Sequence, residues 1–193
     1  MSIRKILQAI IAGGPEDDEK VLRNGGRRIE TIDSSLQNIT RDLLDTMHAY
    51  QICRGLSAPQ IGYPVAISVV TLAREEKEEK FVLINPKIIN ISGKKDIKRE
   101  SCMSVWGYTG EVERREKALI EYQDEDGIQH IEQFHGFEAR VVLHEIDHVN
   151  GILYIDKLVN SDNIQETDLF EGLSNNINIL EVTNTNEEGG IMC

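Results

Sequence analysis

The stretch that decides the fold is GFEARVVLHEIDHVNG, residues 136–151. One face of the expected helix carries residues at spacings of three and four: Phe137, Val141, His144 and His148. The two histidines therefore continue an apolar stripe. Because most of the remaining positions are apolar as well, we expect this helix to lie inside a domain rather than on its surface.

Within the helix, residues 144–148 form a His-Glu-x-x-His motif. Histidines four residues apart share a helical face and can bind one metal ion, while Glu145 can reach the water that such an ion activates. The alternative is a pair of core histidines that only pack. The glutamate between them and the apolar setting favour a catalytic metal site.

Length and charge limit what the rest of the chain can be. With 193 residues, the chain can form one domain with a real core, and we predict a catalytic domain over 1–160 and an acidic, polar tail over 161–193. The net charge of −12 argues against nucleic acid or an anionic membrane as a partner. No stretch is long and apolar enough to span a membrane. Three widely spaced cysteines favour a reducing compartment, so we expect a cytoplasmic protein.

The remaining patterns predict several antiparallel strands and one further helix. Strands are expected over 65–72, 81–91, 117–123 and 128–134, with a charged turn at 74–80 and a second turn around 124–127. A helix is expected from an N-cap at Asp33 to about residue 51, and polar loops or short elements at 13–20, 168–173 and 177–182. Together these elements predict an α+β fold in which antiparallel strands wrap around the central buried helix.

A His-Glu-x-x-His helix supplies two metal ligands, and a catalytic site needs a third. No histidine follows His148, which excludes the metzincin pattern. Cys102 is one candidate because it lies among small and polar residues, although a buried cysteine often has no such role. Glu166 and Glu171 are the other candidates, and they would make the protein a metallopeptidase.

Three segments, taken together, resemble the peptide deformylase family. They occur in the family's order and with similar separations: Gly55-Leu56-Ser57-Ala58-Pro59-Gln60, Glu100-Ser101-Cys102-Met103-Ser104 and His144-Glu145-Ile146-Asp147-His148-Val149-Asn150-Gly151. The family patterns are of the Gly-Leu-Ala-Ala-Pro-Gln, Glu-Gly-Cys-Leu-Ser and His-Glu-x-Asp-His-Leu-x-Gly types. A looser likeness extends from about residue 6 to residue 158.

The resemblance implies an enzyme that removes the formyl group from N-formylmethionine at the start of nascent polypeptides and releases formate. Cys102, His144 and His148 would hold one divalent metal ion. This ion would be Fe(II) in cells, with Zn(II), Ni(II) or Co(II) as alternatives. Glu145 would act as general acid and base. The Gln60 side chain and the Met103 backbone N–H would stabilise the oxyanion.

The resemblance also implies where the substrate binds. We assign substrate contacts to Gly55, Leu56, Glu100 and Arg114; Arg114 would pair with the substrate's backbone or carboxylate, or else be an ordinary surface charge. The expected partner is an N-formylmethionyl nascent peptide, and the expected oligomeric state is a monomer.

The sequence departs from the common family pattern near these motifs. The departures are Cys53, Arg54, Ser101, Trp106 and Leu143. None is an expected metal ligand or Glu145, so we expect them to affect substrate preference and rate rather than the class of reaction. A non-enzymatic alternative is a catalytically weak binding protein that retains the fold.

Overall fold

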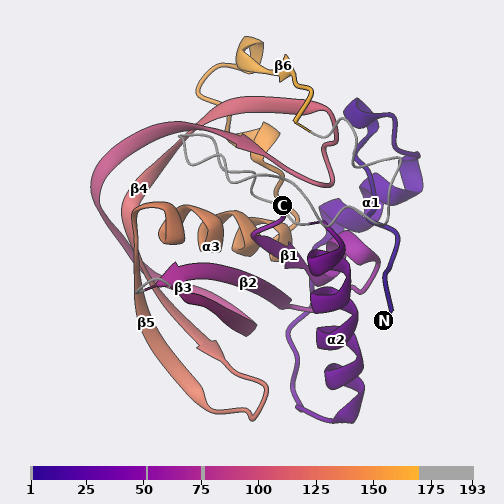
Figure 1. Cartoon of the computed structure of the whole chain (residues 1–193), viewed down its shortest axis with the longest axis vertical. Coiled ribbons are helices and arrows are strands. Elements are labelled where there is room, and N and C mark those ends of the chain that lie inside the picture. The colour runs from indigo at the N-terminus through magenta and orange to yellow at the C-terminus, as the bar shows by residue number, and fades with distance from the viewer. Residues whose placement is uncertain (1, 51, 75–76, 170–193) are drawn as a thin grey trace.

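The computed structural model describes residues 2–50, 52–74 and 77–169. It confirms the α+β class: three α-helices accompany one antiparallel sheet, and helix α3 (Gly136–Val149) lies in the concave space that the long strands enclose (Figure 1). None of the helices in the described ranges is long and apolar enough to cross a membrane.

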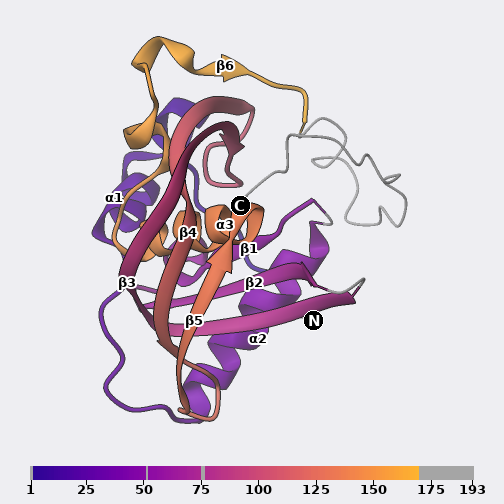
Figure 2. The ribbon, with the colours of Figure 1, turned by 90° about the vertical axis from the view of Figure 1, so that its left-hand side faces the viewer.

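The sheet follows the order of the chain, with each strand antiparallel to the next. Its strands are β1 (Gly55–Ser57), β2 (Ile67–Arg74), β3 (Lys77–Ser101), β4 (Tyr108–Gln123) and β5 (Gln129–His135), and β6 (Gln165–Glu166) pairs with the beginning of β4. The pairing of β3 with β4 shifts register at three places between Ile84 and Lys95. Because such irregularities bend a strand and increase its twist, the β3–β4 ribbon curves around α3 (Figure 2).

Helix α3 is buried along almost its whole length. Every residue from Ala139 to Val149 is buried, and the helix packs on apolar side chains of β2, β3, β4 and β5, including Val70, Leu83 and Ile120. Phe137, which we expected in the core, is 45% exposed. The helix begins directly after the edge strand β5, so its first turn still lies at the rim of the sheet.

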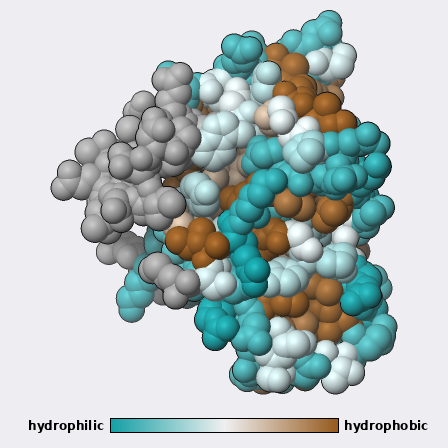
Figure 3. Space-filling view, turned by 90° about the vertical axis from the view of Figure 1, so that its right-hand side faces the viewer, coloured by the Kyte–Doolittle hydropathy of each residue, from teal (hydrophilic) through white to brown (hydrophobic). Residues whose placement is uncertain are grey.

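Helix α2 (Ser34–Ala49) begins as predicted, with the Asp33 side chain accepting a hydrogen bond from Ser35 N at 2.8 Å. It buries Leu43 and Met47 in a second core cluster that also contains Leu56 and Met103. On the face of the molecule that carries α2 and the more N-terminal helix α1 (Glu16–Asn24), hydrophobic surface occurs in patches separated by hydrophilic residues (Figure 3).

Two predictions about polar segments were wrong. Part of the stretch expected as a loop at 13–20 belongs to helix α1 (Glu16–Asn24), whose only buried residue is Leu22. Four acidic residues in its first turn stabilise it through the helix dipole. The charged stretch at 77–80 is also not a turn: it opens β3 and pairs with 71–74 of β2, with its side chains largely exposed.

The remaining elements are short. In the part of the chain that the structure describes, the 3-10 turns are η1 (Ile10–Ala12), η2 (Ala58–Ile61), η3 (Tyr154–Lys157) and η4 (Ser161–Asn163). The beginning of the predicted tail, through η4 and β6, thus packs on β4. The elements expected at 168–173 and 177–182 lie outside the described residues, apart from 168–169.

Candidate metal centre and active site

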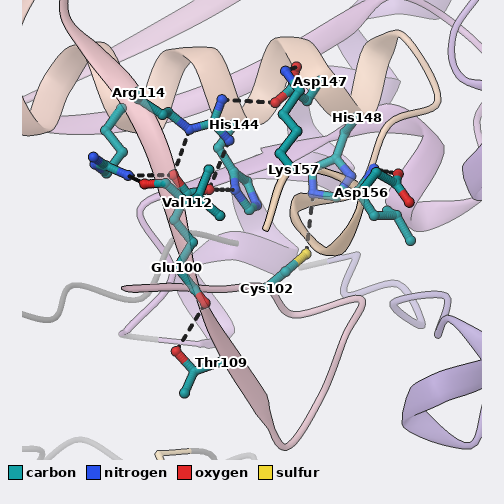
Figure 4. A network of polar contacts seen from close by, with 12 residues as sticks. Glu100, Cys102, Thr109, Val112, Arg114, His144, Asp147, His148, Asp156 and Lys157 are labelled. Atoms are coloured by element: carbon teal, nitrogen blue, oxygen red, sulfur yellow. Dashed lines mark hydrogen bonds and ion pairs between the residues drawn. The ribbon is translucent and has the colours of Figure 1, made fainter. Parts of the chain in front are cut away.

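Cys102, His144 and His148 lie together in the interior. Helix α3 presents the two histidines on one face, and Cys102 follows directly after β3. Their potential ligand atoms all lie within 4.8 Å of one another, and the Cys102 Sγ is 3.2 Å from His148 Nε2 (Figure 4). All three side chains are at most 1% exposed. Within the described ranges, this is the one cluster of histidine, cysteine and acidic residues with the geometry of a metal site.

The hydrogen bonding of His144 fits a bound cation. Its Nδ1 lies 3.0 Å from Glu100 Oε2, and its Nε2 is buried without a hydrogen-bond partner. A carboxylate accepts the Nδ1 proton, which leaves the Nε2 lone pair for a metal. Burial raises the pKa of the Cys102 thiol, so a divalent cation is what would hold it as a thiolate. The donors present therefore fit a metal ion with mixed sulfur and nitrogen ligands.

Behind His144, Glu100 is held by two arginines. It accepts hydrogen bonds from Arg114 Nε at 2.5 Å and Nη2 at 2.8 Å, and from Arg140 Nη1 at 2.8 Å. Burial alone would raise the pKa of Glu100, but the bonds and charge of Arg114, together with His144, hold that pKa well below its usual range. Glu100 is therefore an ionised acceptor with a fixed orientation.

Arg114 joins this carboxylate to a second one. Its Nη1 donates to Asp147 Oδ2 at 2.8 Å, and Asp147 Oδ1 accepts from Lys157 at 2.6 Å (Figure 4). Glu100 and Arg114 were expected at the substrate surface, but the structure places both side chains in the interior, bonded to each other. The reason is that both side chains lie on the inner face of the β3–β4 ribbon, toward α3.

Glu145 lies on the side of α3 that faces β1. Its Oε2 accepts a hydrogen bond from Ser57 Oγ at 2.7 Å, whereas its Oε1 is buried without a hydrogen-bond partner. Burial raises the pKa of Glu145 well above its usual value, against the lowering effect of the Ser57 bond. Glu145 thus combines an oxygen held by Ser57, a second oxygen without a hydrogen-bond partner and a raised pKa.

Gln60 and Met103 lie beside Cys102. The Gln60 Oε1 accepts from Ser57 N at 2.8 Å, and its Nε2 donates to Ser104 Oγ at 3.2 Å and to Cys102 Sγ at 3.6 Å. Met103 follows Cys102 in the chain and is fully buried. The structure therefore brings both expected oxyanion donors next to the sulfur of the metal cluster.

Of the other residues named from the sequence, some are buried and some lie at the surface. Gly55 and Leu56 form the start of β1, and the Leu56 side chain is fully buried. Among the departures, the Arg54 side chain is 41% exposed and bonds to Glu78 at 2.7 Å, and Trp106 packs edge-on against Tyr50. The side chains of Ser101 and Leu143 are buried.

Sequence reasoning missed Ser57, Ser104 and Arg140, all of which contact the site residues directly. Ser57 and Ser104 lie within the quoted motifs, so the likeness of these motifs to the family patterns could have pointed to both serines. Arg140 stands one helical turn before His144, and this spacing places both on the face that meets Glu100.

Comparisons with known proteins agree with this geometry. The family model described as polypeptide deformylase matches residues 15–163. A peptide deformylase of Chloroflexus aggregans is 33% identical over 171 residues, covering 82% of this chain and 88% of its own length. One of Bartonella quintana is 38% identical over 142 residues, covering 72% of this chain and 80% of its own length.

Solved structures of peptide deformylases are also similar to this chain. The peptide deformylase of Ehrlichia chaffeensis in complex with actinonin has a TM-score of 0.74 at 32% identity, covering 84% of this chain and 92% of its own. The enzyme of Thermotoga maritima has a TM-score of 0.73 at 28% identity, covering 83% of this chain and 100% of its own.

Proposed function

Because this chain belongs to the peptide deformylase family, and is therefore a metal-dependent hydrolase that removes the formyl group of nascent polypeptides, we propose how its own residues carry the reaction. The proposal is that Cys102, His144 and His148 hold the metal and that Glu145 moves the proton. The observation that carries it is the buried cluster of three donors, with the His144 Nε2 uncommitted and Glu145 next in the chain.

A bound divalent ion would lower the pKa of water toward neutrality and polarise the formyl carbonyl. We propose Fe(II) as the ion in cells, with Zn(II), Ni(II) or Co(II) able to replace it, because a thiolate with two imidazoles suits all four. Glu100 fixes the His144 ring for this purpose, since its carboxylate holds Nδ1.

Glu145 would accept the proton of the attacking water and pass it to the leaving amine. Ser57 holds one carboxylate oxygen, so the uncommitted Oε1 is the atom that we assign to the proton. The raised pKa of Glu145 supports this role, because the protonated form that must exist between the two transfers is then not costly.

Gln60 Nε2 and the Met103 backbone N–H would donate to the oxyanion of the tetrahedral intermediate. The side chain of Gln60 is oriented by the bond from Ser57 N to its Oε1, which points the NH2 group toward Cys102. Loss of one such donor costs on the order of 10² to 10³ in rate.

Gly55 and Leu56 would contact the substrate through their backbone rather than their side chains. They belong to β1, the first strand of the sheet, so one edge of β1 faces away from β2. An extended peptide can add to such an edge by main-chain hydrogen bonds. Glu100 and Arg114, whose side chains are buried, would support the ligands instead of touching the substrate.

The proposed partner is the formylated N-terminus of a nascent chain, met by a monomeric enzyme in the cytoplasm. The net charge of −12 supports the absence of a direct contact with nucleic acid, because phosphate binding depends on clustered positive charge.

A metallopeptidase with a later glutamate ligand is the enzymatic rival. Glu166 lies on the exposed strand β6 and is not among the cluster's donors, while Glu171 lies outside the described residues. Metal analysis of two variants separates the two functions: Cys102→Ser should lose the bound metal and Glu166→Gln should keep it. The opposite pattern would favour the peptidase.

A further inference from the structure

The N-terminal segment 6–9 runs across the two loops that bear the proposed oxyanion donors. Leu7 N donates to Gln60 O at 2.8 Å, and Ala9 N donates to Ser104 O at 2.8 Å. Both ends of the segment are buried. One short stretch of chain therefore bonds to the turn that carries Gln60 and also to the loop that follows Cys102.

Between these two backbone bonds, the side chain of Gln8 binds the loop after Cys102 at two points. Its Nε2 donates to Met103 O at 2.7 Å, and its Oε1 accepts from Trp106 N at 3.3 Å. A side-chain amide that uses its donor and its acceptor in this way fixes the separation of the two backbone groups. It therefore fixes the shape of the loop from 103 to 106.

The backbone of Gln8 is in turn held by residues of the segment that follows it. Its backbone N–H donates to Asp18 Oδ2 at 3.3 Å. The backbone of Gly14 also packs against it: a Cβ at position 14 would lie 1.9 Å from Gln8 O and 2.8 Å from Gln8 Cβ. The polar residues before and within α1 therefore help to hold the backbone of Gln8 in place.

The two peptide units that flank Met103 are held separately. Cys102 O accepts from Val105 N at 2.9 Å, and a planar trans peptide points its N–H opposite to its C=O. This bond aims the Met103 N–H away from Val105. The next peptide unit, which contains Met103 O, is held by Gln8.

We propose that Gln8 is a positioning residue for the reaction: it holds the peptide unit that follows the Met103 N–H and, through segment 6–9, sets the spacing between that donor and Gln60. The proposal rests on the proposed function, since these donors matter only if an oxyanion forms beside them. Donors of this kind act in the transition state, so a misplaced donor lowers kcat more than it changes KM.

The test compares Gln8→Met, which keeps the length of the side chain and removes its polar atoms, with Gln37→Met on the exposed face of α2. Bound metal, kcat and KM for an N-formylmethionyl peptide, and backbone amide hydrogen exchange are measured. For Gln8→Met we expect kcat to fall by about tenfold or more, with KM and bound metal within about twofold of the wild-type values. Exchange should be faster at 102–106 but not in α3. The Gln37→Met protein should match the wild type.

A Gln8→Met protein with wild-type kcat overturns the proposal. So does a loss of kcat that follows a loss of metal, because Gln8 would then support the ligands and not the donors. Failure of the proposed function looks different: the wild-type protein itself, with its metal bound, would release no formate, and the positioning role of Gln8 would fall with it.

Discussion

Gly55 and Glu145 are in such close contact that any side chain at position 55 would displace the Glu145 carboxyl group. A Cβ at Gly55 would lie 2.6 Å from Glu145 Oε1 and 2.7 Å from Glu145 Cγ. The glycine thus leaves room for the carboxyl group that we assign to proton transfer, and β1 forms one wall of its site. The requirement is one of space, since Gly55 is not among the glycines with positive φ.

Gly55→Ala should therefore damage catalysis by displacing Glu145. We expect kcat to fall by about 10²-fold, the effect of moving a catalytic group by roughly 1 Å, while the bound metal is retained. The measurements are steady-state formate release and metal content. Gly127→Ala is the control, because it introduces backbone strain at a positive φ in the hairpin far from the site. Equal losses of kcat in the two variants would mean that general destabilisation explains the effect.

Glu100→Gln should weaken metal binding. The amide cannot accept the two arginine bonds and the His144 Nδ1 proton as the carboxylate does, so the imidazole loses its fixed orientation. We expect metal affinity to fall by about 10- to 100-fold, measured by competition with a chelator. Glu113→Gln, on the exposed part of β4, should leave affinity unchanged. An unaltered affinity in Glu100→Gln would mean that Glu100 does not orient His144.

Arg114→Met should lower the free energy of unfolding strongly, while each folded molecule keeps most of its activity. Its removal leaves Glu100 and Asp147 without their shared cation in the interior. Breaking a buried ion pair in this way costs about 3–5 kcal/mol, so the denaturation midpoint should shift strongly. Arg115→Met is the matched control, because Arg115 is the next residue along β4 and its own side chain is exposed. A small shift for Arg114→Met would show that Arg140 and Lys157 compensate.

Asp42 should make folding stability depend on pH. Burial opposes its charged form, but hydrogen bonds from neighbours including Tyr63 and Arg4 lower the pKa of Asp42 below its usual value. The folded state therefore favours the carboxylate, and this stabilisation is complete above the unfolded pKa of about 3.9. Chemical denaturation should show the advantage of wild type over Asp42→Asn at pH 7 and its loss as pH falls below about 4. A difference that does not change with pH would contradict the account; Asp17→Asn, on the exposed face of α1, is the control.

The sequence was sufficient for the central helix, the sheet class and the metal cluster, because these depend on residues whose spacing is fixed along one element. His144 and His148 share a face of any helix, so no tertiary information was needed to pair them. The likeness of the motif around Cys102 to the family pattern then indicated the third residue of the cluster.

The position of Arg114 could not be predicted in this way. Which side chains of a strand face the core depends on register, and the pairing of β3 with β4 shifts register at several points. Helix α1 was missed because its stripe contains one buried residue, Leu22, and its stability depends on contacts with the rest of the fold. The role of Gln8 depends on contacts with residues more than 90 positions away, which no local pattern records.

The decisive measurement for the role of Glu145 is formate release from a short N-formylmethionyl peptide by the iron- or nickel-loaded protein, beside Glu145→Gln with the same metal content. We expect release by the wild type and a loss of several orders of magnitude in the variant, since the variant retains its ligands and lacks the group that moves the proton. Release at equal rates would contradict the role of Glu145. No release by the metal-loaded wild type would leave a binding protein that keeps the fold of the family.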